Sequence, residues 1–227
     1  MEFIVVLGAV AAIWLLIAAS GAFPLVLLWF ADFDYVDDPR TTLSRAIRAM
    51  GKQWLIDNRF KPGGAVRPLG IRMALFRHQG GHTALAVYFL QGKTITDFVT
   101  YFSNGVAMTT SNTQDGIVAP LSPGSVMQCL PSMSFEECRL NHIEAVQLLQ
   151  GQLNTTKEPM GELDDEMERA SRRQIRHIFT RPWLILAFPY RYFVLRVRYR
   201  DLTVATQLER GWINIQSLSD RARSRIR

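Results

Sequence analysis

The most pronounced pattern in the chain is an apolar run from residue 3 to residue 30, which contains no charged side chain. About 20 apolar residues in a helix cross the hydrocarbon core of a bilayer, so the run is long enough for a transmembrane helix. Pro24 removes a backbone donor and predicts a kink near the end of that helix. Trp29 and Phe30 follow it, where interfacial aromatic residues are expected. The pattern predicts an uncleaved N-terminal anchor.

The alternative interpretation of this run is a secretory signal peptide cleaved after Ala22, because the residues before the cut are small. Glu2 and the lack of Lys or Arg before the run speak against a signal peptide. Basic residues begin at Arg40, after the run. The positive-inside rule therefore puts the N-terminus outside and the remaining chain in the cytoplasm. The predicted location is the inner cell membrane, with a single span.

Between residues 69 and 110 the pattern changes to alternating apolar segments that are separated by glycine turns. Four such segments predict an antiparallel meander over residues 71–76, 82–90, 94–102 and 106–110. Asn104-Gly105, between the last two, is a strong hairpin signal because both turn positions favour positive φ. The predicted fold class is α+β, with an N-terminal transmembrane helix followed by a small antiparallel β-meander domain that helices flank.

Start signals and helical spacing predict the flanking helices. Asp38 is an N-cap candidate followed by proline, and Ser134 with Glu137 fits a capping box. A third segment begins with acidic and ends with basic side chains, as a helix dipole favours. The predicted helices span residues 39–57, 135–150 and 163–179.

Proline and glycine mark residues 62–68 as a break and residues 111–133 as a loop. The predicted organisation has three parts. Residues 1–31 are the anchor, residues 32–68 are an acidic juxtamembrane linker with an amphipathic basic helix, and residues 69–227 are the α+β domain.

The net charge of +6 is distributed unevenly along the chain. Residues 31–168 contain 12 basic and 16 acidic side chains, whereas residues 169–227 contain 14 basic and 3 acidic ones. A strongly basic C-terminal end predicts an anionic partner, such as phospholipid headgroups, an acidic protein face or nucleic acid. We consider nucleic acid unlikely to be that partner, because the chain has no recognisable nucleic-acid-binding module.

Residues 190–200 alternate in a way that predicts a strand with Arg196, Arg198 and Arg200 on one face. Such a face needs an anionic neighbour, either a lipid surface or the acidic group at residues 162–168. The apolar block at residues 182–189 is too short to span a membrane but suits contact with one. The residues predicted to contact the membrane or an anionic partner are Arg45, Arg48, Lys52, Trp183, Arg191, Arg196, Arg198 and Arg200.

Candidate metal sites are weak. Cys138 and His142 are four residues apart on a predicted helix and could ligate zinc with Cys129, but a buried thiol and a helix-surface histidine are the favoured interpretation. The acidic group at residues 32–38 lacks the glycine and the glutamate of a calcium loop. No metal or cofactor is therefore predicted. The two cysteines suit a reducing compartment, and one disulfide is the alternative.

Catalytic signals are also weak. Serine, cysteine and histidine candidates are present, but none lies in a specific motif, and the glycine pairs lack the lysine of a phosphate-binding loop. These candidates are Ser103, Ser111, Cys129, His78, His82 and His142. The predicted function is a non-catalytic accessory or scaffolding subunit that contacts anionic lipid or an acidic protein partner. The alternatives are a membrane-associated enzyme that acts on a lipid-linked substrate, and a ligand-sensing module.

Overall fold

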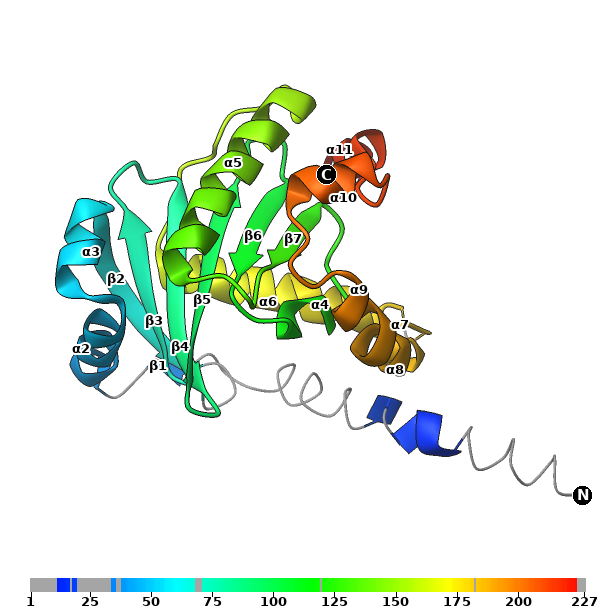
Figure 1. Ribbon diagram of the computed structural model, residues 1–227, viewed down its shortest axis with the longest axis horizontal. Coiled ribbons are helices and arrows are strands. Elements are labelled where there is room, and N and C mark those ends of the chain that lie inside the picture. Colours follow the sequence, from blue (N-terminus) through cyan, green and yellow to red (C-terminus); the bar gives the residue numbers. More distant parts are fainter. Residues whose placement is uncertain are drawn as a thin grey trace, which may run out of the picture.

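The computed structural model describes residues 12–16, 18–19, 34–35, 38–67, 71–118, 120–181 and 183–223. The described residues form one seven-stranded sheet with helices on both faces (Figure 1). The strands lie in the order in which they occur in the chain, and neighbours are antiparallel except for the parallel pair β6 and β7. The predicted α+β class is confirmed.

The sheet begins with a two-residue strand and ends with a five-residue strand. The strands are β1 (Asp34–Tyr35), β2 (Phe60–Arg67), β3 (Met73–His78), β4 (Thr83–Leu90), β5 (Lys93–Tyr101), β6 (Ala107–Ser111) and β7 (Ser125–Cys129). β1 pairs with β2 through Asp34 opposite Arg67 and Tyr35 opposite Val66.

The helices are described in two groups along the chain. The first group extends from α2 to α6, and the second occupies the last part of the chain from residue 183. The first group is α2 (Pro39–Met50), α3 (Lys52–Asp57), α4 (Asp115–Val118), α5 (Phe135–Leu153) and α6 (Leu163–Phe179). The second is α7 (Trp183–Leu186), α8 (Phe188–Tyr190), the π-helix η2 (Arg191–Leu195), α9 (Arg196–Arg198), α10 (Val204–Glu209) and α11 (Ile215–Arg223).

The predicted anchor, residues 3–30, falls mostly outside the described residues. Its described parts, residues 12–16 and 18–19, are helical. Among the helices that the structure describes, none has the combined length and apolar character of a membrane span.

The predicted meander is confirmed as β3 to β6, each strand antiparallel to the next. The turn between β5 and β6 differs from the expected two-residue turn. The N–H of Gly105 donates to the carbonyl of Phe102 and the N–H of Phe102 donates to the carbonyl of Val106, each at 2.9 Å. Gly105 has φ +82°, so the loop is a three-residue turn that ends in a left-handed glycine. Asn104 contributes through its side chain, whose Oδ1 accepts from the N–H of Val106.

The sequence pattern does not predict three of the strands, β1, β2 and β7. β2 lies largely in the segment interpreted as a break, and the register shift between Pro62 and Gly64 shows that a bulge accommodates these residues. Gly63 allows α6 to approach, because a Cβ there would contact the side chain of Leu163. β7 lies in the segment interpreted as a loop and pairs in parallel with β6. β2 precedes the predicted boundary at residue 68 and pairs with β3, which follows it.

The helix predictions hold with local corrections. The helix predicted over residues 39–57 is divided at Gly51, which has φ +86°. The capping box of Ser134 and Glu137 is present, and the helix continues through Gly151 to end at Asn154, which is in the left-handed conformation. The third helix has the predicted bounds, residues 163–179.

The strand predicted over residues 190–200 is wrong, because this segment is helical. Alternation and helical spacing overlap here. Phe193, Leu195, Val197 and Tyr199 fit one face of a strand. Phe193 and Val197 also lie at helical spacing from Trp183, Leu186 and Tyr190.

Two differently packed faces follow from the alternation of the strands. The face under α2, α3 and α5 buries large side chains such as Phe76, Leu85, Val87 and Phe98. The opposite face, under α6, presents smaller ones on the same strands, including Ala84. Figure 1 shows α5 in front of the sheet and α6 behind it.

Candidate functional site

An exposed apolar stripe runs along the helical segment from α7 to α9, residues 183–198, which we call the aromatic arm. Trp183 is 60% exposed, Phe193 is 57% exposed and Val197 is 70% exposed. The stripe consists of Trp183, Leu186, Tyr190, Phe193, Val194 and Val197, all exposed and at helical spacing. A helix in a globular domain normally turns such a stripe toward the core. Here the stripe faces outward, as at interaction surfaces.

The inner side of the aromatic arm fastens it to the domain. Pro189 is buried, and Nε of Arg191 donates a 2.9 Å hydrogen bond to the carbonyl of Val118. Burial lowers the pKa of Arg191 below its ordinary value, since desolvation disfavours the charged form. Arg191, predicted to contact an anionic partner, therefore points into the protein.

The helical turns of the aromatic arm shift at η2, where the N–H of Arg196 donates to the carbonyl of Arg191. A π-helical turn inserts an extra residue and rotates the side chains that follow. Phe188 stacks on Tyr192 with ring centroids 6.3 Å apart, and Tyr192 meets Phe193 edge to face. These ring contacts hold the arm in one conformation.

The predicted ladder of three arginines on one strand face is absent from the described segment, because the segment is helical. Arg196 lies over the ring of Tyr192, with 5.0 Å between its Cζ and the ring centroid. Arg198 is exposed and lies 4.6 Å from the ring of Trp212. Arg200 binds Asp201 at 3.3 Å and donates to Ser132. Arg196 and Arg198 therefore lie beside the apolar stripe at the end of the aromatic arm. Arg200, which follows the arm, connects it to the loop after β7 through Ser132.

The acidic group at residues 162–168 makes ion pairs within its own helix. Glu166 pairs with Arg169 at 2.8 Å, and Glu168 pairs with Arg172 at 2.7 Å. Spacings of three and four residues bring such side chains together on a helix.

A second contact links the aromatic arm to the apolar N-terminal run. The indole Nε1 of Trp14 donates a 2.9 Å hydrogen bond to the carbonyl of Leu186. Ile13, Leu15 and Leu16, beside Trp14, are exposed like the stripe itself. Two apolar surfaces that are 172 residues apart in the chain thus lie side by side.

Arg45, Arg48 and Lys52 lie on α2 and α3, at the end of the sheet opposite the aromatic arm (Figure 1). All three are exposed, and Arg45 lies 4.0 Å above the ring of Phe89. The structure does not bring these residues together with the arginines of the arm.

His142 is fully buried, so its interpretation as a helix-surface histidine is wrong. Its Nε2 lies 2.9 Å from Oγ1 of Thr100 and its Nδ1 lies 2.8 Å from Oγ1 of Thr110. Gln128 donates to Thr110 and accepts from the N–H of Val204. Burial lowers the pKa of His142 to about 3, so the ring is neutral. Both ring nitrogens have partners in a structural network that sequence reasoning missed.

The cysteine and serine candidates are also buried or hydrogen-bonded within the fold. Cys129 and Cys138 are buried and not joined by a disulfide, and burial raises the pKa of the Cys138 thiol to about 12. The hydroxyl of Ser103 is hydrogen-bonded to the hydroxyls of Thr155 and Thr156, and the hydroxyl of Ser111 donates to the carboxyl group of Asp97. Asp38 caps α2 as predicted, and Asp32 and Asp37 of the acidic group lie outside the described residues. Where the chain is described, no three His, Cys, Asp or Glu side chains are grouped to hold a metal ion.

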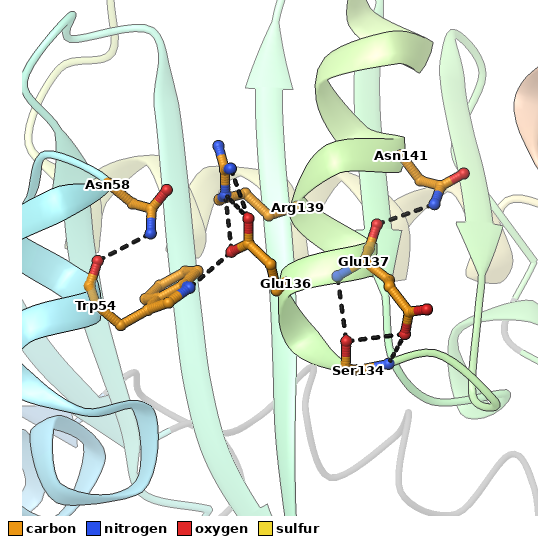
Figure 2. Close-up of polar contacts among 7 residues, drawn as sticks. All are labelled: Trp54, Asn58, Ser134, Glu136, Glu137, Arg139 and Asn141. Atoms are coloured by element: carbon orange, nitrogen blue, oxygen red, sulfur yellow. Dashed lines mark hydrogen bonds and ion pairs between the residues drawn. The ribbon is translucent and has the colours of Figure 1, made fainter.

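Figure 2 shows polar contacts that join α3 to α5. Nε1 of Trp54 donates to Oε2 of Glu136 at 2.6 Å, and Arg139 binds the same carboxylate at 2.6 Å. The pKa of Glu136 is lowered below its ordinary value, and the largest cause is the hydrogen bond from Arg139. Ser134 and Glu137 complete the cap of α5 beside this cluster.

Comparisons of the chain with protein-family models, curated proteins and solved structures found no match.

Proposed function

We infer that the protein is a single-pass protein of the inner cell membrane whose cytoplasmic α+β domain docks on anionic lipid through the aromatic arm. In this role it is a non-catalytic accessory or scaffolding subunit. The observation that carries the inference is the outward apolar stripe of the arm, beside which Arg196 and Arg198 lie.

The chemistry of the aromatic arm suits the interface of a bilayer. Helices that lie in the interface have an apolar face with Trp, Phe or Leu and a polar face with Arg or Lys. Burying one large apolar side chain contributes about 1.5–3 kcal/mol, and each basic residue near an anionic surface adds about 1 kcal/mol. Arg198, which is exposed, can keep its guanidinium group among headgroups while its stem covers apolar surface, whereas Arg196 is half-buried over the ring of Tyr192.

The N-terminal run supports the same role. An anchor at residues 3–30 holds the domain close to the bilayer, and the basic residues that follow it favour the cytoplasmic side. The proposed contact set is narrower than the one predicted from the sequence. Arg191 faces inward, and Arg45, Arg48 and Lys52 belong to the other end of the sheet.

A polarity-sensitive dye tests the docking on the full chain reconstituted in vesicles. The variant Phe193→Cys places the dye on the stripe, and Ile56→Cys, also exposed, places it on α3 as a matched control. Cys129 and Cys138 are buried and react poorly. We expect a blue shift at position 193 in vesicles that contain phosphatidylglycerol, which salt weakens, and none at position 56.

The docking model is wrong if the dye at position 193 reports water in anionic vesicles. It is equally wrong if positions 193 and 56 shift together, because the arm would then have no special contact. The Arg196→Gln, Arg198→Gln double variant should weaken the shift at position 193 by about 2 kcal/mol of binding free energy.

A further inference from the structure

A cavity of about 290 Å³ lies between α6 and the sheet. Its existence follows from small residues at the positions that face α6. β4 alternates Ala84, Leu85, Ala86 and Val87, so its alanines line the cavity while its larger residues fill the other face. Protein interiors rarely leave voids larger than a water molecule. A space of this size is therefore a feature of the fold to be explained.

Methionines form much of the cavity wall. Four of the eight methionines in the chain line it, from β3, β7, α6 and the segment before α6. They are Met73, Met127, Met160 and Met167. Thioether side chains are unbranched and polarisable and adapt to ligands of different shape. Such a wall suits a ligand with an apolar body.

One carboxyl group lies in this apolar wall. Asp97, half-buried on β5, lines the cavity, and its oxygens accept hydrogen bonds from Ser111 and from Tyr88, the latter at 3.1 Å. Each carboxylate oxygen has two lone pairs, so each keeps acceptor capacity after these bonds. Glu166 and Arg173 of α6 also line the cavity, and Glu166 is paired with Arg169. Asp97 therefore offers free acceptor capacity on the sheet side of the wall, and Arg173 supplies a donor on the α6 side.

We propose that this cavity binds a small amphiphile, with one apolar chain and a hydroxyl or amine head that donates a hydrogen bond to Asp97. An apolar cavity of about 150 Å³ holds benzene, so this one holds about twice that, or roughly a dozen heavy atoms. An anionic head is disfavoured beside Asp97, because it would face a carboxylate without a donor of its own.

The test uses the full chain in lipid nanodiscs with ¹³C-labelled methionine methyl groups, titrated with 1-decanol, decylamine or decanoate. Met50, Met108 and Met133 lie in the cores on the other face and are internal controls. We expect saturable shifts of the four cavity methionines with decanol and decylamine, and weaker binding of decanoate, whose head would face the carboxylate of Asp97. Shifts of all the methionines together, no shift, or equal shifts with decanoate would overturn the proposal.

Variants test the position of the ligand. Ala86→Leu fills the cavity floor, and Gly116→Ala displaces the side chain of Met127, which a Cβ at residue 116 would contact. Each should abolish the ligand shifts, while the control methionines report that the fold is kept. Asp97→Asn should weaken decylamine binding at least about tenfold, because a charge-assisted hydrogen bond is lost. Ligand shifts that survive Ala86→Leu in a folded protein, or undiminished decylamine binding to Asp97→Asn, would contradict this site.

Discussion

The indole N–H of Trp54 donates to the carboxylate of Glu136, 82 residues along the chain, and this bond joins α3 to α5. Trp54 also stacks on Phe60 and meets Phe135 edge to face. One side chain thus connects the helix before the sheet, the first long strand and the helix after it.

Breaking the Trp54–Glu136 bond should destabilise the domain moderately. We expect the single variants Trp54→Phe and Glu136→Ala to be coupled by about 1–2 kcal/mol in a double-mutant cycle, because each removes the charge-assisted bond. Denaturant unfolding measures the coupling. Glu144→Ala, on the same helix, is the control in a parallel cycle with Trp54→Phe. Additive free energies for the Trp54–Glu136 pair would show that the bond contributes nothing.

The buried carboxyl of Asp97 should make the fold less stable as pH rises from about 4 to about 6. Burial raises its pKa from 3.8 to about 6, so the folded protein binds the proton more tightly than the unfolded chain. The stability that the neutral carboxyl contributes is fully present below pH 3.8. About 3 kcal/mol of the free energy of unfolding is lost by the time the pH reaches 6. Asp97→Asn should therefore stabilise the protein at pH 7 and lose that advantage at pH 4. Equal effects at both pH values in denaturant unfolding would refute this.

His142 should make the fold less stable as pH falls, which is the opposite of the effect of Asp97. Its pKa is lowered from 6.5 to about 3, so the unfolded chain binds the proton more tightly. The stability that the neutral ring contributes is present above pH 6.5 and declines as pH falls toward 3. His142→Leu should flatten this decline, whereas His177→Gln, on α6, should leave it unchanged. Denaturant midpoints between pH 7 and 4 test it, and an unchanged slope in His142→Leu would count against the buried neutral ring.

Gln128 should couple the C-terminal helices to the sheet. Its amide donates to Thr110 and to the carbonyl of Asn141, and its oxygen accepts from the N–H of Val204 at 2.9 Å. Gln128→Met keeps the volume but removes all three hydrogen bonds and leaves the buried N–H of Val204 without this acceptor, at a cost of about 3 kcal/mol. Hydrogen exchange at the Val204 amide should accelerate more than at Ile175 in α6. Uniform acceleration would indicate a general loss of stability instead.

Local signals in the sequence were enough to predict part of the fold. The capping box at Ser134 and the charge gradient of residues 163–179 are one-dimensional patterns, and both helices begin where these signals lie. The four meander strands were predictable because their partners are adjacent in the chain. β7 was not, because its parallel pairing with β6 depends on a crossover that no local pattern encodes.

The candidate site was predictable in composition but not in geometry. The apolar and basic character of residues 183–198 is evident from the sequence. The same residues, however, fit both the two-residue period of a strand and the 3.6-residue period of a helix, and the sequence alone does not distinguish the two. Whether an arginine faces inward, as Arg191 does, depends on the distant carbonyl of Val118. Asp97 offered an overlooked signal, since an acidic residue within an otherwise apolar strand needs partners for its carboxyl group.

β1 gives the proposed anchor a mechanical consequence. Three residues separate residue 30 from Asp34, and an extended chain covers about 3.5 Å per residue, so the sheet edge stays within about 14 Å of residue 30. Tyr35 and Asp34 are paired with β2. The linker therefore keeps the domain close to the proposed anchor. A force applied to the N-terminal segment acts first on the backbone hydrogen bonds between β1 and β2, before any other part of the sheet.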